Sequence, residues 1–336
     1  MKLEEVYFMF SDAFKVRVSV GTAALLKLMH VKLLAYPTTA YLMTYTSGRC
    51  VANCAFCPQA RGSRSNLKLL SRISWPTYSL NQVCEALENG KMRRICVQTI
   101  NYPHLFEDLQ VILGQIRRVA PRIPVSLPIH PISEGKMKVL RDLGVERLSI
   151  PFDAATPRIF DEIKGKHVGG PYRWEVHVKA IKKAIKIFGD GKVSTHLIIG
   201  LGENEEEAVN FIQEFSDLNV TVGLFAFTPI TGTKLEKLLP PPIGKYRRIQ
   251  LARYLIQNKM VRKEDMVFEK GKIVGFGLPY RELDKIVESG LPFMTSGCPN
   301  CNRPFYNESP RGPIYNYPWK PSKNEVKRIR KELYFP

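Results

Sequence analysis

Short runs of β-branched and aromatic residues alternate with amphipathic segments of helical spacing over most of the chain. The runs predict strands and the segments predict helices, an alternation typical of a parallel α/β fold. Strands are expected at Tyr41–Thr46, Arg93–Thr99, Pro124–Ile129, Arg147–Phe152, Val193–Ile199 and Val220–Phe227, with two weaker ones at Ile273–Phe276 and Pro292–Thr295. Helices are expected between them at Leu80–Asn89, Leu105–Arg118, Glu134–Asp142, Trp174–Phe188, Glu205–Asp217 and Lys245–Asn258. These strand–helix units predict a TIM-type (β/α)8 barrel, complete or slightly open.

The pattern divides the chain into three regions. Residues 1–36 are expected to form an N-terminal helical extension, residues 37–290 the barrel, and residues 291–336 a C-terminal segment with a basic tail. Because the C-terminal segment follows the last weak strand, it is expected to start at the carboxyl face of the barrel, where active sites of such barrels lie.

Alternation along the expected strands separates the side chains that face the helices from those that face the barrel interior. Ile95 and Val97 suit the apolar helix side, so their neighbours should point inward. The residues assigned to the interior by this parity are Arg94, Cys96, Gln98, Ser126, His130, Ser149, Asp153, Ser194, His196 and Ile198. An interior this polar predicts a reaction chamber rather than a packed core.

Composition narrows the possible environments of the protein. The 336 residues, 44% of them hydrophobic, can bury one large core. The net charge of +19 fits either a solvated surface or a polyanionic partner, such as an acidic carrier protein or a nucleic acid. No apolar stretch is long enough to cross a membrane, and the N-terminus lacks the basic start of a signal peptide. Seven cysteines, three of them closely spaced, favour a reducing compartment and therefore a cytoplasmic location.

Cys50, Cys54 and Cys57 form a C-x3-C-x2-C run with Phe56 before the last cysteine. Three thiolates in a compact loop can hold a [4Fe-4S] cluster and leave one iron open to an outside molecule. Zinc is the competing metal, but a structural zinc site takes a fourth protein ligand. No Cys or His lies between Cys57 and Cys84, so the run favours the cluster.

This run resembles the signature of the radical S-adenosylmethionine (SAM) superfamily. The resemblance implies that the open iron binds SAM and that the cluster cleaves it to a 5′-deoxyadenosyl radical, while the protein positions the cofactor. The stretch from His196 to Glu203 is similar to the superfamily pattern G-x-I-x-G-x-x-E, with His196 in place of the first glycine. The resemblance assigns SAM contacts to Phe56, Asp153, Ile198, Gly200, Glu203 and Pro229.

Two of the expected SAM contacts have alternatives. Asp153 could instead cap the helix that starts near Thr156. Arg173 could clamp the methionine carboxylate through two hydrogen bonds, or it could be an exposed arginine at a helix start. The Gly-Gly-Glu element expected after the second strand is absent, which leaves the SAM amino group without an assigned partner.

The sequences Cys57-Pro-Gln-Ala-Arg61 and Gly200-Leu-Gly-Glu203 resemble the biotin synthase and lipoyl synthase branch, which inserts sulfur into unactivated C–H bonds. Biotin synthases hold a sacrificial cluster with cysteines from the second, third and fifth strands. Here Cys96 matches the second strand, but Ser126 and Ser194 stand at the other two positions. A cluster of the biotin synthase type therefore cannot form on these residues.

A second cysteine motif, Ser296-Gly-Cys298-Pro-Asn-Cys301, begins the C-terminal segment. Together with Cys96 it could give three thiolates to an auxiliary [4Fe-4S] cluster, with Ser296 as an oxygen ligand like the serine of lipoyl synthases. The alternatives are a zinc knuckle with distant ligands or a pair of inert thiols. Cys84 is expected to be a core residue, because it lies on the apolar stripe of a helix.

The tail after Cys301 resembles the C-terminus of the two-protein lipoyl synthases of archaea and some bacteria. The resemblance implies one subunit of such an enzyme, with C–S bonds formed at C6 or C8 of a protein-bound octanoyl chain and catalytic roles for Cys96, Ser296 and His196. The implied partners are an octanoylated lipoyl carrier protein or domain, a second radical SAM subunit and an electron donor such as ferredoxin. The alternatives are a biotin synthase-like enzyme, a methylase, a tRNA methylthiotransferase, or a zinc-stabilised nucleic-acid-binding protein, although no appended RNA-binding module is evident.

Overall fold

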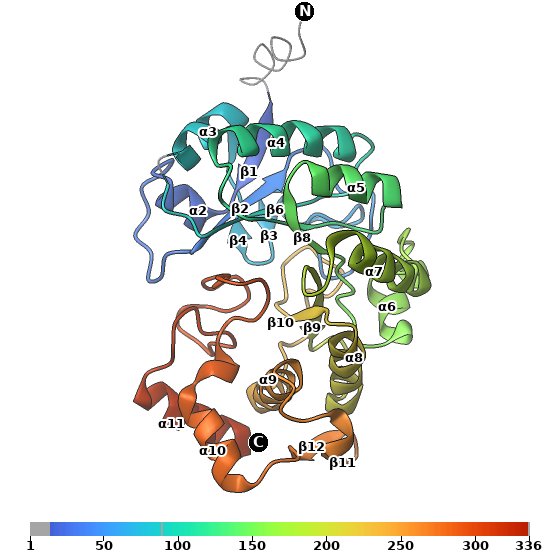
Figure 1. Cartoon of the computed structure of the whole chain (residues 1–336), viewed down its shortest axis with the longest axis vertical. Coiled ribbons are helices and arrows are strands. Elements are labelled where there is room, and N and C mark those ends of the chain that lie inside the picture. The colour runs from blue at the N-terminus through green and yellow to red at the C-terminus, as the bar shows by residue number, and fades with distance from the viewer. Residues whose placement is uncertain (1–13, 89, 335–336) are drawn as a thin grey trace, which may run out of the picture.

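The computed structural model describes residues 14–88 and 90–334, and its centre is a sheet of eight strands. Six of the strands are parallel and follow one another in the sheet (Figure 1). They are β2 (Thr39–Thr44), β6 (Arg94–Gln98), β7 (Val125–Pro128), β8 (Val145–Ser149), β9 (Val193–Ile199) and β10 (Thr221–Ala226). The six stronger strand predictions are therefore confirmed to within a few residues.

The N-terminal edge of the sheet differs from the prediction. Strand β1 (Lys15–Val18) pairs antiparallel with β2, and β5 (Thr77–Ser79) pairs antiparallel with β1. The expectation of helices over residues 1–36 is thus wrong for Lys15–Val18. Of residues 14–36, only Val20–Leu25 (α2) form an α-helix, and residues 1–13 lie outside the described residues. The physical reason is the period of two in Lys-Val-Arg-Val, because Val16 and Val18 are fully buried against the sheet.

The two weaker strands do not join the sheet. Residues Lys272–Gly275 (β12) form a separate hairpin with Val267–Glu269 (β11), in which Val274 is exposed. The expected strand at Pro292–Thr295 is instead a 3-10 turn, η3 (Leu291–Phe293), followed by a single bridge from Met294. The barrel is therefore the open form of the predicted fold and not the complete eight-unit ring.

Helices cover the convex side of the sheet (Figure 1). They include all six expected helices, whose positions are confirmed, and a short additional one after β8. These helices are α3 (Leu80–Glu88), α4 (Leu105–Val119), α5 (Glu134–Asp142), α6 (Pro157–Ile163), α7 (Trp174–Phe188), α8 (Glu205–Asp217) and α9 (Ile243–Gln257). Two further helices, α10 (Tyr280–Ser289) and α11 (Lys323–Tyr334), pack near α9 and near each other. In the described residues, no helix is both long and apolar enough to span a bilayer.

Residues 296–308, in the orange-red loop between the sheet and α10 in Figure 1, fill the gap on the open side of the sheet. The loop starts at the amino ends of the strands, where the Arg94 Nε donates to the carbonyl of Pro299 at 3.0 Å and the Thr38 N–H donates to Asn302 at 2.9 Å. It ends at the carboxyl end of β10, where Thr228 donates to the carbonyl of Asn307.

This path corrects the expected position of the second cysteine motif. Cys298 and Cys301 enter from the amino ends of the strands, opposite to the face that carries Cys50–Cys57. The reason is that the segment expected as the last strand, Pro292–Thr295, forms a 3-10 turn and a single bridge instead and does not carry the chain up to the carboxyl face.

Candidate functional site

The loop after β2 places the first three cysteines at the carboxyl ends of the parallel strands. Cys50, Cys54 and Cys57 line one cavity, and all three thiols are free. The loop is fixed by its own backbone, since the Cys50 N–H donates to the Gln59 carbonyl at 2.9 Å and the Cys57 N–H donates to the Cys54 carbonyl at 3.0 Å. The sequence run therefore forms one cradle of inward-facing sulfurs.

The chemistry of these thiols fits an iron–sulfur cluster. Burial raises the pKa of Cys57 to about 12 and also raises the pKa values of Cys50 and Cys54. Such thiols become thiolates when a cationic soft metal centre compensates their charge. Across residues 14–88 and 90–334, no three Cys, His, Asp or Glu side chains group closely enough to hold a single metal ion. The cysteines surround a shared cavity instead.

Asp153 and Lys164 form a buried ion pair in the wall of this cavity. The Lys164 Nζ lies 2.6 Å from the Asp153 Oδ2 and donates to the Pro151 carbonyl at 2.6 Å. Asp153 adopts a left-handed backbone conformation with φ of +65°. The alternative role of Asp153 as a helix cap does not apply, because the Thr156 hydroxyl accepts from the Ile159 N–H and caps α6 itself.

Lys164 was not among the residues expected from sequence. The sequence carried little signal for it, because Lys164 follows Asp161-Glu162-Ile163 and serves as the C-terminal cap residue of α6. A buried lysine beside a carboxylate marks a functional site more often than a surface lysine does.

A neighbouring cavity continues from the cysteine loop toward β10. Phe56, Asp153 and Ile198 line it, as expected for residues that bind the adenosine part of SAM. The loop after β10 completes the wall through Thr228 and Ile230, which flank Pro229. Because Phe56, Cys57 and Asp153 line both cavities, the two form one continuous site, and we call them the SAM-side cavities.

The four other expected SAM contacts are not among the residues that line these cavities: Pro229, Gly200, Glu203 and Arg173. The buried Glu203 carboxylate accepts from the Gly200 N–H at 2.8 Å and the Leu201 N–H at 2.9 Å, and it pairs with Lys245. Gly200 has φ of +106°, and an added Cβ would lie 2.9 Å from Pro241. Both residues therefore shape the turn after β9. Arg173 is exposed and donates to the carbonyls of Gly170 and Tyr172, so the cation that the structure places in the cavity is Lys164.

The three cysteines expected to hold the auxiliary cluster, Cys96, Cys298 and Cys301, meet in the barrel interior, and we call them the second thiol set. Cys96 on β6 lines a cavity together with Cys298 and Cys301 from the C-terminal segment. Each thiol contacts a polar side chain of the wall at 3.1–3.3 Å, and these pairs are Gln98 with Cys96, Ser126 with Cys298 and Tyr41 with Cys301. The interior direction predicted from strand parity for Cys96, Ser126 and Ser194 is confirmed.

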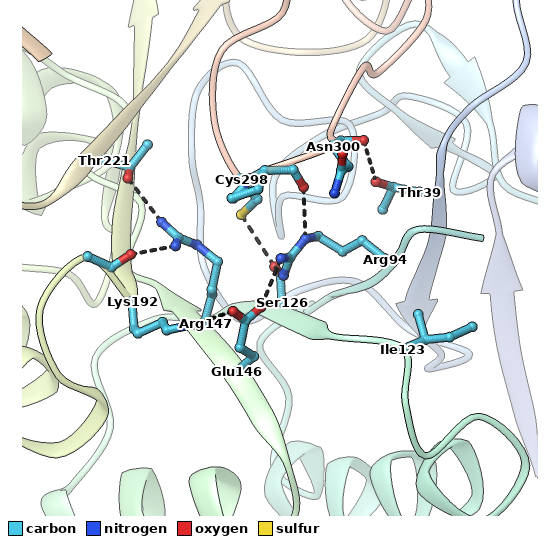
Figure 2. Close-up of polar contacts among 12 residues, drawn as sticks. Thr39, Arg94, Ile123, Ser126, Glu146, Arg147, Lys192, Thr221, Cys298 and Asn300 are labelled. Carbon is cyan, nitrogen blue, oxygen red and sulfur yellow. Dashed lines mark hydrogen bonds and ion pairs between the residues drawn. The ribbon is translucent and has the colours of Figure 1, made fainter. Parts of the chain in front are cut away.

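Arg94 connects the C-terminal segment to the barrel wall (Figure 2). Its guanidinium donates to the Ser126 hydroxyl at 2.8 Å and to the Pro299 carbonyl at 3.0 Å, and it pairs with Glu146 at 2.8 Å. Since Ser126 also contacts the Cys298 sulfur, one buried arginine fixes both sides of the second thiol set.

Arg303 brings a cation to the interior cavity that Cys96, Cys298 and Cys301 line. Its guanidinium lies 3.8 Å from the ring centre of Phe225 and donates to the Ser296 carbonyl at 2.7 Å. Its Nε and Nη1 are buried and have no hydrogen-bond partner of normal geometry among the described residues. Burial raises the pKa of Cys301, and the Arg303 charge opposes that shift. Unsatisfied buried donors beside thiols fit an anionic group such as a cluster with its sulfides.

Ser296 and His196 both line the interior cavity, and strand parity had predicted the inward direction of His196. The Ser296 hydroxyl accepts from the Leu224 N–H at 2.8 Å and lines the interior cavity. His196 lines the interior cavity and both parts of the SAM-side site, and its Nε2 lies 3.3 Å from the Ser149 hydroxyl. Burial lowers the pKa of His196 to about 4, so the ring is neutral at pH 7 and separates the two thiol sets without adding charge.

The Asp153–Lys164 pair should behave as one coupled unit. We expect Asp153→Asn and Lys164→Gln each to lower the free energy of unfolding by roughly 3–5 kcal/mol, because each leaves one buried charge without its partner. The double variant should lose less than the sum of the two, with a coupling energy of about 1–3 kcal/mol. Urea denaturation of the four proteins measures this cycle, and additivity within about 0.5 kcal/mol would contradict the pair.

Comparison with known proteins agrees with this geometry. The family model described as the radical SAM superfamily matches residues 44–215. The biotin synthase of Clostridium acetobutylicum is 25% identical over 228 residues, which cover 64% of this chain and 65% of that protein. The biotin synthase of Citrifermentans bemidjiense is 30% identical over 203 residues, which cover 56% of each chain. The match therefore spans less than two thirds of the length of these relatives.

A solved structure shares the fold. The X-ray structure of the FeFe-hydrogenase maturase HydG from Carboxydothermus hydrogenoformans aligns with a TM-score of 0.50 at 18% identity, over 65% of this chain and 51% of that one. The family match covers about half of the chain and includes the cysteine loop, the Asp153 wall and the strand that carries His196 and Ile198. The chain belongs to the radical SAM superfamily.

Proposed function

We propose that this protein is a radical SAM sulfur-insertion enzyme and acts as one subunit of a two-component lipoyl synthase. In this proposal it forms one or both C–S bonds at C6 and C8 of a protein-bound octanoyl chain. The observation that carries the proposal is the second thiol set, because Cys96, Cys298 and Cys301 line the chamber next to the SAM-side cavities.

Cys50, Cys54 and Cys57 would hold the cluster that binds SAM and supplies reductive SAM cleavage. Phe56 and Ile198 would hold the adenosine part, and Asp153, which lines the same cavity, would contact the ribose. Lys164 holds the Asp153 carboxylate in position through their 2.6 Å contact. These side chains bind and orient the cofactor before any bond is broken.

The second thiol set would hold an auxiliary cluster as the sulfur donor. Cys96, Cys298 and Cys301 supply three thiolates, Ser296 supplies a candidate oxygen ligand, and Arg303 supplies buried N–H donors that face the anionic group. The neutral His196 lines the chamber between this set and the SAM side, where an acyl chain would lie against it.

The positions of two serines favour the lipoyl reaction over the biotin reaction. Ser126 and Ser194 line the interior where biotin synthases carry cysteines, so a second cluster here depends on the C-terminal segment. Leu70, Pro128 and Phe225 give the same chamber apolar walls, which suit a hydrocarbon chain. An octanoylated carrier, a second radical SAM subunit and an electron donor such as ferredoxin belong to this proposal.

The first three cysteines should be required for radical formation. Cys50→Ala, Cys54→Ala and Cys57→Ala should each abolish formation of 5′-deoxyadenosine from SAM under dithionite, because the open-iron cluster cannot assemble on two thiolates. Chromatography of the quenched reaction measures the product. Cys84→Ser is the matched control, since Cys84 is a buried core residue of α3, and it should keep its iron. SAM cleavage near the wild-type rate in any of the three variants would refute the assignment.

The second thiol set should be separable from radical formation. Cys298→Ala or Cys301→Ala should retain SAM cleavage, lose sulfur transfer and lower the iron content by roughly half, because the two clusters do different work. Iron analysis and 5′-deoxyadenosine formation are measured on the same sample. Unchanged iron in both variants would show that Cys298 and Cys301 are structural thiols.

The mass gained by an octanoyl substrate tests the proposed reaction. The reconstituted protein with SAM and reductant should add one sulfur to an octanoyl-lysine peptide or an octanoylated carrier domain, and a second radical SAM subunit should raise this to two. Mass spectrometry of the peptide reads the gain. If no octanoyl substrate changes while a transfer RNA gains sulfur, the lipoyl proposal fails and the methylthiotransferase alternative replaces it.

A further inference from the structure

Two loops at the carboxyl end of the sheet form a fixed rim beside the SAM-side cavities. The Arg64 N–H and the Ser63 hydroxyl donate to the Gly232 carbonyl at 2.7 Å and 3.1 Å, and the Leu235 N–H donates to the Ala55 carbonyl at 3.2 Å. Gly232 has φ of +84°, and an added Cβ would lie 2.5 Å from the Ser65 nitrogen. The contact requires glycine and joins the cysteine loop to the loop after β10.

Five exposed basic side chains stand on this rim, and we call them the basic rim: Arg61, Arg64, Lys166, Lys234 and Lys237. Arg61 donates to the Gly169 carbonyl at 3.1 Å and so connects the loop that carries Lys166. In the part of the chain that the structure describes, Arg64, Lys234 and Lys237 have no ion-pair partner. The nearby Glu236 carboxylate accepts a hydrogen bond from the Gly232 N–H at 2.6 Å.

An apolar patch adjoins the basic rim. Leu238 is 39% exposed and Leu239 is 79% exposed, directly after Lys237. Leucines of this exposure next to unpaired charges are typical of protein interfaces, which combine an apolar centre with a polar border. Single-stranded nucleic acids are instead bound by aromatic side chains that stack on bases. The loops 58–68 and 228–240 contain no aromatic residue.

We propose that the basic rim and Leu238–Leu239 dock an acidic folded protein domain, which presents an acylated lysine arm to the cavity below. This inference rests on the proposed function and adds the surface on which the carrier is recognised. Unpaired lysines attract an acidic partner over about 8–10 Å at ordinary salt, which speeds encounter more than it slows release. The folded domain stays outside while only its flexible arm enters.

The test compares two charge-matched variants. Lys234→Glu with Lys237→Glu reverses two charges of the basic rim, and Lys272→Glu with Lys285→Glu reverses two exposed charges on β12 and α10, outside the rim. Binding of an octanoylated acidic lipoyl domain is measured by stopped-flow fluorescence at several salt concentrations. The rim variant should bind roughly ten-fold more weakly, mainly through a slower on-rate, and its salt dependence should flatten. The control should bind like the wild type.

Further measurements on the same variants distinguish the possible outcomes. Both variants should keep the wild-type unfolding midpoint and rate of SAM cleavage, and Lys237→Glu alone replaces the double variant if the latter unfolds. Equal binding of the domain by the rim and control variants overturns the inference, even if an octanoyl peptide gains sulfur. Tighter, rim-dependent binding of a transfer RNA than of the domain also overturns it. Rim-dependent binding of a domain that is never modified supports the surface and refutes the proposed function.

Discussion

An open parallel sheet leaves a gap between its two edges, and the closure of that gap by residues 296–308 determines the arrangement of the interior. Arg303 spans the gap, because its guanidinium stacks on Phe225 of β10 while its backbone N–H donates to the Tyr41 hydroxyl of β2 at 3.0 Å. Tyr306 packs against the same Tyr41 ring with centroids 4.9 Å apart. Together with the contacts of Arg94, these contacts fix the positions of Cys298 and Cys301 relative to Cys96.

The closure also explains why two thiol sets can share one chamber. The first set enters from the carboxyl ends of the strands and the second from the amino ends, so neither loop blocks the other. His196 and its partner Ser149 lie between them on the chamber wall. A substrate that enters from the basic rim would meet the SAM side first and the second thiol set at the bottom of the chamber.

Local sequence patterns were sufficient to predict the parallel strands of the sheet and the first cysteine loop. The period of two located the parallel strands and the inward direction of Cys96, Ser126 and His196, because one face of these strands packs against apolar helices and the other lines a polar cavity. The C-x3-C-x2-C run located the first cysteine loop, since its spacing reflects a local turn. The short strand at Lys15–Val18 was missed, because four residues give too little signal against a helical background.

The rest could not be predicted because it depends on contacts between distant segments. The approach of the C-terminal loop is set by the contacts of Pro299 with Arg94 and of Asn302 with Thr38, which join the loop to strand starts more than 200 residues away. The cation of the SAM-side cavity is Lys164 and not Arg173, because the end of α6 turns inward while the start of α7 faces solvent. Gly200 and Glu203 match a family pattern, yet their observed contacts are with the turn and with α9.

The proposed function requires two separate clusters in the chain, of which only one binds SAM. The most direct measurement is iron and sulfide analysis of the anaerobically reconstituted wild-type protein, combined with electron paramagnetic resonance before and after SAM is added. Two [4Fe-4S] clusters require about eight irons per chain, and the signal of one cluster only should change when SAM is added. About four irons with a single SAM-sensitive signal, or colourless protein with bound zinc, would contradict the proposed function.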